Sequence, residues 1–494
     1  MATVRLTASD LYSYMRPAPC ELRVHLLYGR EAQVAPSVFE ELLLRLGIRH
    51  EREYLDSLGE VLNLTGFSEG GRLDTTRQAV GDGVPVIYQG ALEAEAELLG
   101  VACTIYGEPD FLVRFGDGYV IRDAKLSRRI NESEHPEIIQ SLRLYAWLYE
   151  QSFGLPPAAL EVFAGNLKLV EIEVGQGDQF LQSLSSVLGG KVAAEEPFSP
   201  VGWSKCQGCG FRTRCWDPAV ERNDVAILPD VDVGLARALR DRGISVISEL
   251  SDRFSIESLA EFRRPRGRQL VKVGKKAERI LLHAEAWERD EPLVLGPLAI
   301  PQHDSYVVFD LEGLPPFADD LDRIYLWGFK VFGAKTGVPH AVAACPGEDG
   351  DRETWYEFLD AAALVMNEHS DIPWVHWSAY ERTYVRKYVE RFGDRAGVAA
   401  RLQEHLVDLL PLAKDALILP IPSYSLKAVE EYVGFKRSQD AFGGDWSIAR
   451  YIEAVESEDL EERTQLLDEI CTYNREDLEA TWAVLQWMLV KTAA

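Results

Sequence analysis

The apolar residues between positions 107 and 125 are distributed as two short strands joined by a tight turn. The turn is Gly116-Asp117-Gly118, and the β-rich run Tyr119-Val120-Ile121 follows it. Glycines between two such runs predict a β-hairpin. Asp110 stands where the first strand begins, and Asp123 and Lys125 lie two residues apart on the second. Since side chains alternate along a strand, Asp123 and Lys125 are expected on the same face.

Helical patterns flank this hairpin on both sides. Residues 38–58 predict a long amphipathic helix that is interrupted near Gly47 and carries His50, and residues 136–151 predict a second helix, which carries Gln140. Residues 159–164 and 167–174 predict strands, and residues 178–188 predict a further helix. This order of elements indicates an α/β domain over residues 1–222.

The pattern changes after residue 222. Residues 227–252 have the short-helix rhythm of a helix-hairpin-helix module. Residues 262–280 hold eight lysines and arginines against one acid, Glu278. We therefore expect a small helical segment over residues 223–295, in which the basic run contacts phosphates. A solvated linker is the alternative for that run.

A third domain is expected over residues 296–494, again of the α/β class. Its opening strand, residues 305–313, places Asp310 and Glu312 two apart on one face. Near the end of the chain a predicted helix makes Tyr473 and Asp477 i, i+4 neighbours. Between these elements another predicted strand is followed by Glu381.

Composition narrows the function classes. The 494 residues are 47% hydrophobic, which is ample for packed cores. No apolar run approaches the roughly 20 residues of a membrane helix, and residues 1–14 lack the apolar core of a cleavable signal, so we expect a soluble, cytoplasmic protein without membrane partners. The net charge of −27 argues against indiscriminate binding to a polyanion. It does not exclude nucleic acid, because carboxylate-rich metal sites are neutralised by their own cations.

Asp110, Asp123 and Lys125 supply the groups that phosphodiester hydrolysis requires. A hard divalent cation needs carboxylate oxygens that converge from separate elements. Attack on a phosphodiester also needs a positive charge beside the water and the developing negative charge. D-x-K alone is equally compatible with an ion pair on a surface hairpin. The pattern G-x-P-D, then a strand, then D-x-K is much more specific, and it favours a nuclease.

This stretch resembles the core of the PD-(D/E)XK nucleases, specifically their RecB-like branch. The resemblance implies that Asp110 and Asp123 bind Mg²⁺ or Mn²⁺, with the carbonyl of Ala124 as a further ligand. It also implies that Lys125 positions or activates the attacking water.

Two helical motifs of the RecB-like branch have counterparts here. The branch carries a histidine that helps to bind metal, which His50 matches, and an imidazole among carboxylates favours manganese. It also carries a Q-x-x-x-Y motif, which implies an active-site role for Gln140. The sequence departs from this motif because Tyr145 follows Gln140 by five residues.

Three of the seven cysteines crowd into ten residues as C-x2-C-x5-C, namely Cys206, Cys209 and Cys215. A tetrahedral metal site needs a fourth thiolate, and no second C-x2-C pair lies nearby. RecB-like nucleases with iron and sulfur use a single cysteine before the catalytic core, where Cys20 stands. The resemblance therefore implies a [4Fe-4S] cluster held by Cys20 and these three cysteines, with zinc as the alternative.

The third domain resembles the DEDD exonucleases of RNase H-like fold. The shared features are D-x-E on an opening strand and Y-x-x-x-D on a closing helix. The resemblance implies two metal ions about 4 Å apart, held by Asp310, Glu312, Glu381 and Asp477, with Tyr473 orienting the attacking water. The family usually has aspartate where Glu381 stands, so the carboxylate here is longer by one methylene.

The three parts in this order resemble a prokaryotic family of RecB-like nucleases with an appended RNase H-like domain. Members are expected to work beside a UvrD-type helicase, and no G-x-x-x-x-G-K-[ST] phosphate loop is present in this sequence. We expect a metal-dependent exonuclease that acts on single strands or ends of DNA, in repair, processing or defence. The alternatives are a nucleic-acid-binding scaffold with an inert RNase H-like half and an RNA-processing 3′ exonuclease that uses the C-terminal site.

Overall fold

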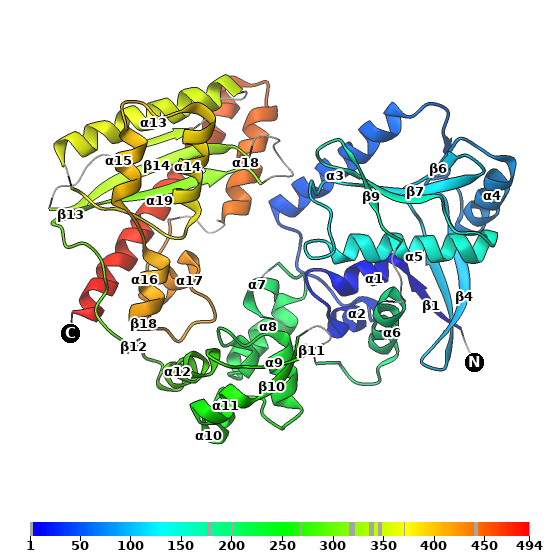
Figure 1. Ribbon diagram of the computed structural model, residues 1–494, viewed down its shortest axis with the longest axis horizontal. Helices are drawn as coiled ribbons and strands as arrows, with labels where there is room; N and C mark the ends of the chain where they lie inside the picture. The colour runs from blue at the N-terminus through cyan, green and yellow to red at the C-terminus, as the bar shows by residue number, and fades with distance from the viewer. Residues whose placement is uncertain are drawn as a thin grey trace. The chain divides into compact units, whose positions relative to one another are not determined.

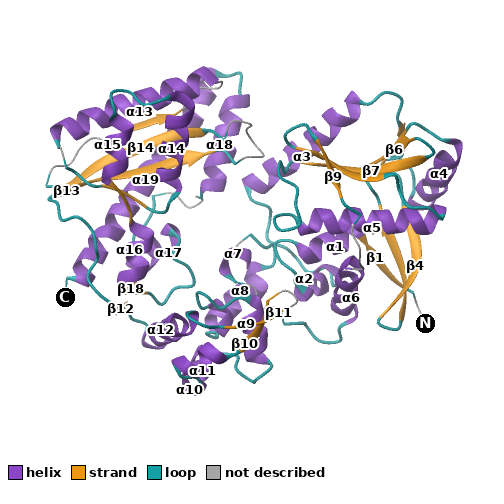
Figure 2. Ribbon diagram, viewed as in Figure 1, coloured by secondary structure: helices purple, strands orange, loops and turns teal. Residues whose placement is uncertain are grey.

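The computed structural model describes residues 3–174, 179–198, 202–206, 208–266, 269–315, 322–334, 340–343, 348–369, 371–438 and 443–493. These residues form two compact units, and the chain passes from the first to the second after residue 218 (Figures 1 and 2). Both units combine helices with β-sheet, which confirms the predicted α/β class. Among the described residues, no helix is both long and apolar enough to cross a membrane.

The first unit is built on a six-stranded sheet with the order β2-β3-β6-β7-β8-β9. The strands are β2 (Leu62–Asn63), β3 (Val86–Tyr88), β6 (Phe111–Phe115), β7 (Gly118–Lys125), β8 (Ala159–Ala164) and β9 (Leu169–Ile172). β6 and β7 pair as an antiparallel hairpin, as the sequence predicts. Along its other edge, β7 pairs with β8 in parallel.

The two faces of the β6–β7 hairpin pack against different helices. Tyr119 and Ile121 join the core beneath α5 (Pro136–Phe153), whereas Ala124 joins a cluster with Tyr54 of α3 (Val38–Ser57). Because side chains alternate along a strand, Asp123 shares the face of Ile121 and looks toward α5.

Helix α3 runs without a break through Gly47, so the predicted interruption is wrong. A glycine inside a helix costs only about 1 kcal/mol relative to alanine. Four side chains spaced four residues apart are buried along α3 and outweigh this cost: Leu42, Leu46, His50 and Tyr54.

A smaller sheet with the order β1-β5-β4 completes the first unit. Its strands are β1 (Val4–Thr7), β4 (Leu92–Leu98) and β5 (Val101–Gly107), and the remaining helices are α1 (Ala8–Met15), α2 (Glu21–Tyr28), α4 (Glu69–Asp82), α6 (Gln179–Val192), α7 (Trp203–Cys206) and α8 (Arg212–Glu221). Helix α5 packs against strands of both sheets and against α1 and α6 (Figure 1). It therefore joins the two sheets into one core.

The second unit opens with short helices and a small hairpin. They are η1 (Val225–Ile227), α9 (Val233–Arg240), α10 (Ile247–Arg253), α11 (Ile256–Glu261), β10 (Arg263–Arg266), β11 (Gln269–Lys272) and α12 (Lys276–Arg289). The basic run thus forms a hairpin and the start of a helix, with residues 267–268 outside the described set. Three of its cations are paired with acids of the same segment: Arg264 with Asp232, Lys272 with Glu261, and Lys276 with Asp230. These pairs reduce the positive charge that the run presents to phosphates.

The remainder of the second unit is a five-stranded sheet with the order β15-β14-β13-β16-β17. Its strands are β13 (Ser305–Gly313), β14 (Ile324–Gly333), β15 (His340–Ala343), β16 (Trp374–His376) and β17 (Leu406–Asp408). β13 is antiparallel to β14 and parallel to β16. Short strands β12 (Leu293–Val294) and β18 (Leu417–Ile418) pair with each other. The predicted domain boundaries at 222/223 and 295/296 stay predictions.

Helices cover both faces of this sheet (Figure 2). They are α13 (Glu348–Glu368), α14 (Tyr380–Phe392), α15 (Val398–His405), α16 (Leu409–Ala416), α17 (Leu426–Val433), α18 (Gly444–Glu456) and α19 (Leu460–Thr492). Phe309 of β13 packs in a core with α13 and α14, whereas Val308 packs in a core with α16 and α19. Alternation along β13 therefore directs Asp310 and Glu312 to the side of α19.

Candidate active sites

Asp110, Asp123 and Lys125 meet at the end of the β6–β7 hairpin. The Nζ atom of Lys125 lies 3.2 Å from Oδ2 of Asp110 and 3.1 Å from Oδ2 of Asp123. Backbone donors fix the carboxylates, since the amide of Asp110 donates to Oδ1 of Asp123 (3.2 Å) and the amide of Ala124 donates to Oδ2 of Asp110 (2.9 Å). The hairpin register itself thus brings the three charged groups together.

Burial makes this charge arrangement costly without a cation. Burial and the neighbouring Asp123 raise the pKa of Asp110 to about 7. Burial alone lowers the pKa of Lys125, but Asp110 and Asp123 outweigh it and raise that pKa well above its ordinary value. Lys125 therefore stays charged. A divalent cation would further favour the ionised form of Asp110.

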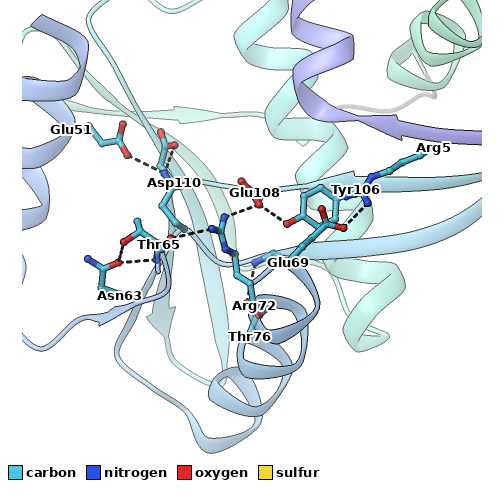
Figure 3. Close-up of polar contacts among 12 residues, drawn as sticks. Arg5, Glu51, Asn63, Thr65, Glu69, Arg72, Thr76, Tyr106, Glu108 and Asp110 are labelled. Carbon is cyan, nitrogen blue, oxygen red and sulfur yellow. Dashed lines mark hydrogen bonds and ion pairs between the residues drawn. The ribbon is translucent and has the colours of Figure 1, made fainter. Parts of the chain in front are cut away.

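A third carboxylate, that of Glu51 on α3, lies beside Asp110 (Figure 3). Gln89 Nε2 connects the two, 3.0 Å from Oε1 of Glu51 and 3.4 Å from Oδ1 of Asp110. The hydroxyl of Tyr88 donates to the same Glu51 oxygen at 2.8 Å. Local sequence patterns do not indicate Tyr88 or Gln89, and the sequence marks Glu51 as a weaker metal-binding candidate than His50, which it follows directly.

His50 contacts the sheet on a different side from Asp123. Its ring stacks on Phe163 of β8 with centroids 4.9 Å apart, and its Nε2 lies 3.1 Å from the carbonyl oxygen of Phe163. Phe163 is the cross-strand partner of Ala124. Because a carbonyl only accepts, Nε2 carries the hydrogen and Nδ1 keeps a lone pair, as in a histidine that binds metal through its other nitrogen.

The two predicted positions on α5 lie in different surroundings. Gln140 is buried, and its Nε2 lies 3.3 Å from Oε1 of Gln179 on α6. Tyr145, also on α5, lies close to the carboxylates of Asp110 and Asp123: burial, then Asp123 and Asp110, raise its pKa well above the ordinary value.

Gly107 makes room for Tyr145. A Cβ at position 107 would lie 2.8 Å from ring atoms of Tyr145 and 2.8 Å from Cδ1 of Leu148. The next residue, Glu108, pairs with Arg72 of α4 at 2.6 Å and accepts a hydrogen bond from the hydroxyl of Tyr106 (Figure 3). The turn that carries Asp110 is thereby tied to a helix and a neighbouring strand.

The four predicted cluster cysteines gather although 186 residues separate the first two. Cys20 caps the N-terminus of α2 and packs with Cys209 and Cys215 around Leu22, Leu26 and Phe211. A guanidinium nitrogen of Arg23 lies 3.8 Å from Sγ of Cys209.

Neighbouring cysteines also raise the pKa values of Cys206 and Cys215, because ionised thiolates would repel each other. Burial, then Cys209 and Cys20, raise the pKa of Cys215 to about 11, and burial with all three neighbours raises the pKa of Cys206. Four thiols from two distant segments, costly to ionise without a metal, are a donor set that fits an iron–sulfur cluster or zinc.

Asp310, Glu312 and Asp477 form a second carboxylate group in the C-terminal unit. Their ligand atoms all lie within 4.8 Å of one another. Asp310 and Glu312 come from β13 and Asp477 from α19. Burial and the neighbouring carboxylates raise the pKa of Asp310 well above its ordinary value, so this group also fits a divalent cation.

Neighbouring donors hold each of these carboxylates. Nδ2 of Asn474 donates to Oδ2 of Asp310 at 2.7 Å, the hydroxyl of Tyr325 donates to Oε2 of Glu312 at 3.3 Å, and Arg437 pairs with Oδ1 of Asp477. Sequence motifs gave no signal for these three donors.

Tyr473 also belongs to the C-terminal site. Its side chain forms a hydrogen bond with Asp477. Burial, then the charge of Asp477, raise the pKa of Tyr473 well above its ordinary value. Burial raises the pKa of Asp477 to about 6, although Arg437 and the bond from Tyr473 lower it.

Glu381 lies outside the group of three carboxylates, although its charge contributes to the raised pKa of Asp310 and of Glu312. Its Oε2 lies 3.1 Å from Nδ1 of His376, and both side chains are buried. Within the described part of the chain, the carboxylate group consists of Asp310, Glu312 and Asp477 without Glu381. The structure therefore brings together three of the four carboxylates that the sequence singled out.

Comparisons with known proteins agree with this description. Residues 25–216 match the family model of the PD-(D/E)XK nuclease superfamily, and residues 307–489 match that of the RNase H superfamily. A search of curated proteins finds no match. One solved structure, described as the crystal structure of SSO0001, is 14% identical to this chain. The aligned region covers 44% of this chain and 87% of the other chain, with a TM-score of 0.25. The chain has an N-terminal PD-(D/E)XK domain and a C-terminal RNase H-like domain, both of nuclease-type hydrolases.

Proposed function

We propose that this protein is a metal-dependent DNA nuclease of the RecB-like branch, which hydrolyses single strands or ends of DNA at the Asp110–Asp123–Lys125 site. The observation that carries this proposal is the ammonium of Lys125 within 3.2 Å of both carboxylates. An Asp–Asp–Lys set that a hairpin register holds in place is suited to phosphodiester hydrolysis, because the reaction requires concentrated positive charge.

Each group has a defined task in this proposal. Asp110, Asp123 and the Ala124 carbonyl would hold Mg²⁺ or Mn²⁺, and Glu51 or Nδ1 of His50 would complete the site from α3. A bound cation would supply a polarised water and neutralise charge on the phosphate. Because Lys125 stays protonated, it orients the attacking water and donates to a phosphate oxygen instead of accepting the proton. We assign Gln140 to the framework that positions α5.

We further propose that Cys20, Cys206, Cys209 and Cys215 hold a [4Fe-4S] cluster with a structural task. The cluster would join the segment before the catalytic core to the segment after it, and no redox step is needed for hydrolysis. Zinc is the alternative for the same four thiols.

The C-terminal site supports a second candidate activity, a 3′ exonuclease that acts on RNA or DNA. Three buried carboxylates with ligand atoms within 4.8 Å favour it. Tyr473, which bonds to Asp477, would orient the attacking water. A UvrD-type helicase acting beside the protein in the cytoplasm would deliver single strands to either site.

Cleavage of a defined substrate panel tests the proposed function. Linear and circular single-stranded DNA, blunt duplex DNA and single-stranded RNA are incubated with Mg²⁺ or Mn²⁺ and with wild type, Asp123→Asn or Asp477→Asn. We expect linear single-stranded DNA to be degraded, circular DNA to be spared, and Asp123→Asn to lose this activity. RNA degradation that only Asp477→Asn abolishes would assign the function to the C-terminal site. Metal-independent binding without cleavage would indicate the scaffold.

A further inference from the structure

The C-terminal site differs from a two-metal centre in the surroundings of its carboxylates. A two-metal centre holds cations about 3.5–4 Å apart and needs enough free carboxylate oxygens for both. Here protein donors already engage each carboxylate: Oδ2 of Asp310, Oε2 of Glu312 and Oδ1 of Asp477 each have a side-chain partner. Tyr473 also bonds to Asp477, and the backbone amide of Leu311 bonds to Asp310. The acceptor positions that these donors leave are few, which suits one cation that keeps several waters.

Glu381, the carboxylate expected to support a second ion, is committed elsewhere. Nδ1 of His376 lies 2.6 Å from the carbonyl oxygen of Ser378 and 3.1 Å from Oε2 of Glu381. Both partners are acceptors, so Nδ1 carries a hydrogen that Glu381 shares. With 0% and 3% exposure for His376 and Glu381, separating the pair would leave polar groups unsatisfied in the interior.

Arg437 supplies a permanent positive charge to the same site. Its Nε lies 2.7 Å from Oε1 of Glu430, its Nη2 lies 2.8 Å from Oε2 of Glu430, and Nη2 also pairs with Asp477. The guanidinium also lies over the ring of Tyr473, 5.5 Å from its centroid. A planar, always charged group with this many contacts is fixed in position.

We propose that the C-terminal centre binds one divalent cation, and that the guanidinium of Arg437 takes the electrostatic place of the second. This inference rests on the proposed nuclease function of that site. Arg437 acts as a positioning residue: it orients Asp477 and keeps positive charge beside the position where phosphate charge develops.

Counting Mn²⁺ ions at the C-terminal centre tests this proposal. The full-length protein carries Asp110→Asn and Asp123→Asn to silence the first site, and the C-terminal ions are those lost when Asp310→Asn is added. Equilibrium binding gives their number. Electron paramagnetic resonance separates an isolated Mn²⁺ from a spin-coupled pair, because only neighbouring ions couple. Arg437→Gln, Arg437→Lys and the exposed control Arg395→Gln, which disrupts an ion pair with Asp360, are compared after circular dichroism confirms folding.

The possible outcomes distinguish a failure of the one-cation inference from a failure of the proposed nuclease function of this site. We expect one uncoupled Mn²⁺ in the silenced parent, in Arg437→Lys and in Arg395→Gln, and a coupled pair in Arg437→Gln. A coupled pair in the parent would overturn the inference and leave the nuclease proposal intact. One ion in both the parent and Arg437→Gln would show that Arg437 does not take the place of a second cation. No Mn²⁺ at all would contradict metal-dependent function at this site and the inference with it.

Discussion

Nζ of Lys125 lies 3.2 Å from Oδ2 of Asp110, although the two residues stand at opposite ends of the hairpin sequence. Because β6 and β7 are antiparallel, the end of β7 lies next to the start of β6, so Lys125, the last residue of β7, contacts Asp110, the residue before β6. The contact is therefore a consequence of strand pairing, and its loss should affect chemistry more than folding.

Lys125→Ala should lower the cleavage rate about 10²–10³-fold, the range for removal of one preorganised donor that stabilises developing charge. Affinity for single-stranded DNA should change by less than about threefold, since the backbone contacts of the substrate remain. Single-turnover rates and fluorescence polarisation measure the two quantities. Lys168→Ala, at an exposed position of the same unit, is the matched control. An equal loss of rate and affinity would assign Lys125 to substrate binding.

Gly107→Ala should impair both activity and stability, because the added Cβ would meet Tyr145 and the fully buried Leu148 at 2.8 Å. Overpacking of this kind costs about 1–3 kcal/mol. Urea unfolding and cleavage assays measure the effects. Gly118→Ala on the same hairpin, where the nearest atom would be 3.9 Å away, should be tolerated; equal behaviour of the two variants would contradict the account of Gly107.

Cys20→Ser and Cys209→Ser should each lose the bound metal. The anaerobically purified wild type should be brown and contain about four irons and four sulfides per chain, and loss of the cluster should destabilise the first unit by about 4–5 kcal/mol, by analogy with long-loop disulfides. Elemental analysis, absorbance and thermal unfolding check this, with Cys471→Ser as the control. Stoichiometric zinc without iron would replace the cluster with the zinc alternative.

His283 should make the second unit less stable in acid. This buried histidine has Nδ1 3.3 Å from the carbonyl oxygen of Leu419, and burial followed by the charge of Arg279 lowers its pKa to about 4. A lowered pKa means that the unfolded chain binds the proton more tightly, so stability is lost as pH falls from about 6.5 toward 4. Between pH 7 and pH 5 the loss should be about 2 kcal/mol.

The pH effect is isolated by comparing variants. The free energy of unfolding of the second unit is measured in urea at pH 7 and pH 5 for wild type, His283→Gln and the exposed His303→Gln. His283→Gln should lose less stability over this interval than the other two proteins. An identical loss in all three would show that His283 has no part in it.

Local patterns predicted the parts of the sites that lie close together in the chain. Asp123 and Lys125 share a strand face because of the two-residue period, and Asp310 and Glu312 do so for the same reason. Glu51 is marked only by its position directly after His50, and Arg437 carries no signal, since each reaches its site across a tertiary contact that no spacing encodes. Glu381 stands at the expected position, but His376, five residues earlier, competes for its carboxylate. That competition depends on burial, which a motif does not express.

The central claim is metal-dependent cleavage of DNA at the N-terminal site, and single-turnover cleavage of end-labelled linear single-stranded DNA tests it most directly. Wild type, Asp123→Asn and Asp117→Asn, a change at an exposed turn position of the same hairpin, are compared in Mg²⁺ and in EDTA. We predict equal rates for wild type and Asp117→Asn, no cleavage in EDTA, and a rate at least about 100-fold lower for Asp123→Asn with the C-terminal site intact. Cleavage by Asp123→Asn at the wild-type rate would contradict the account.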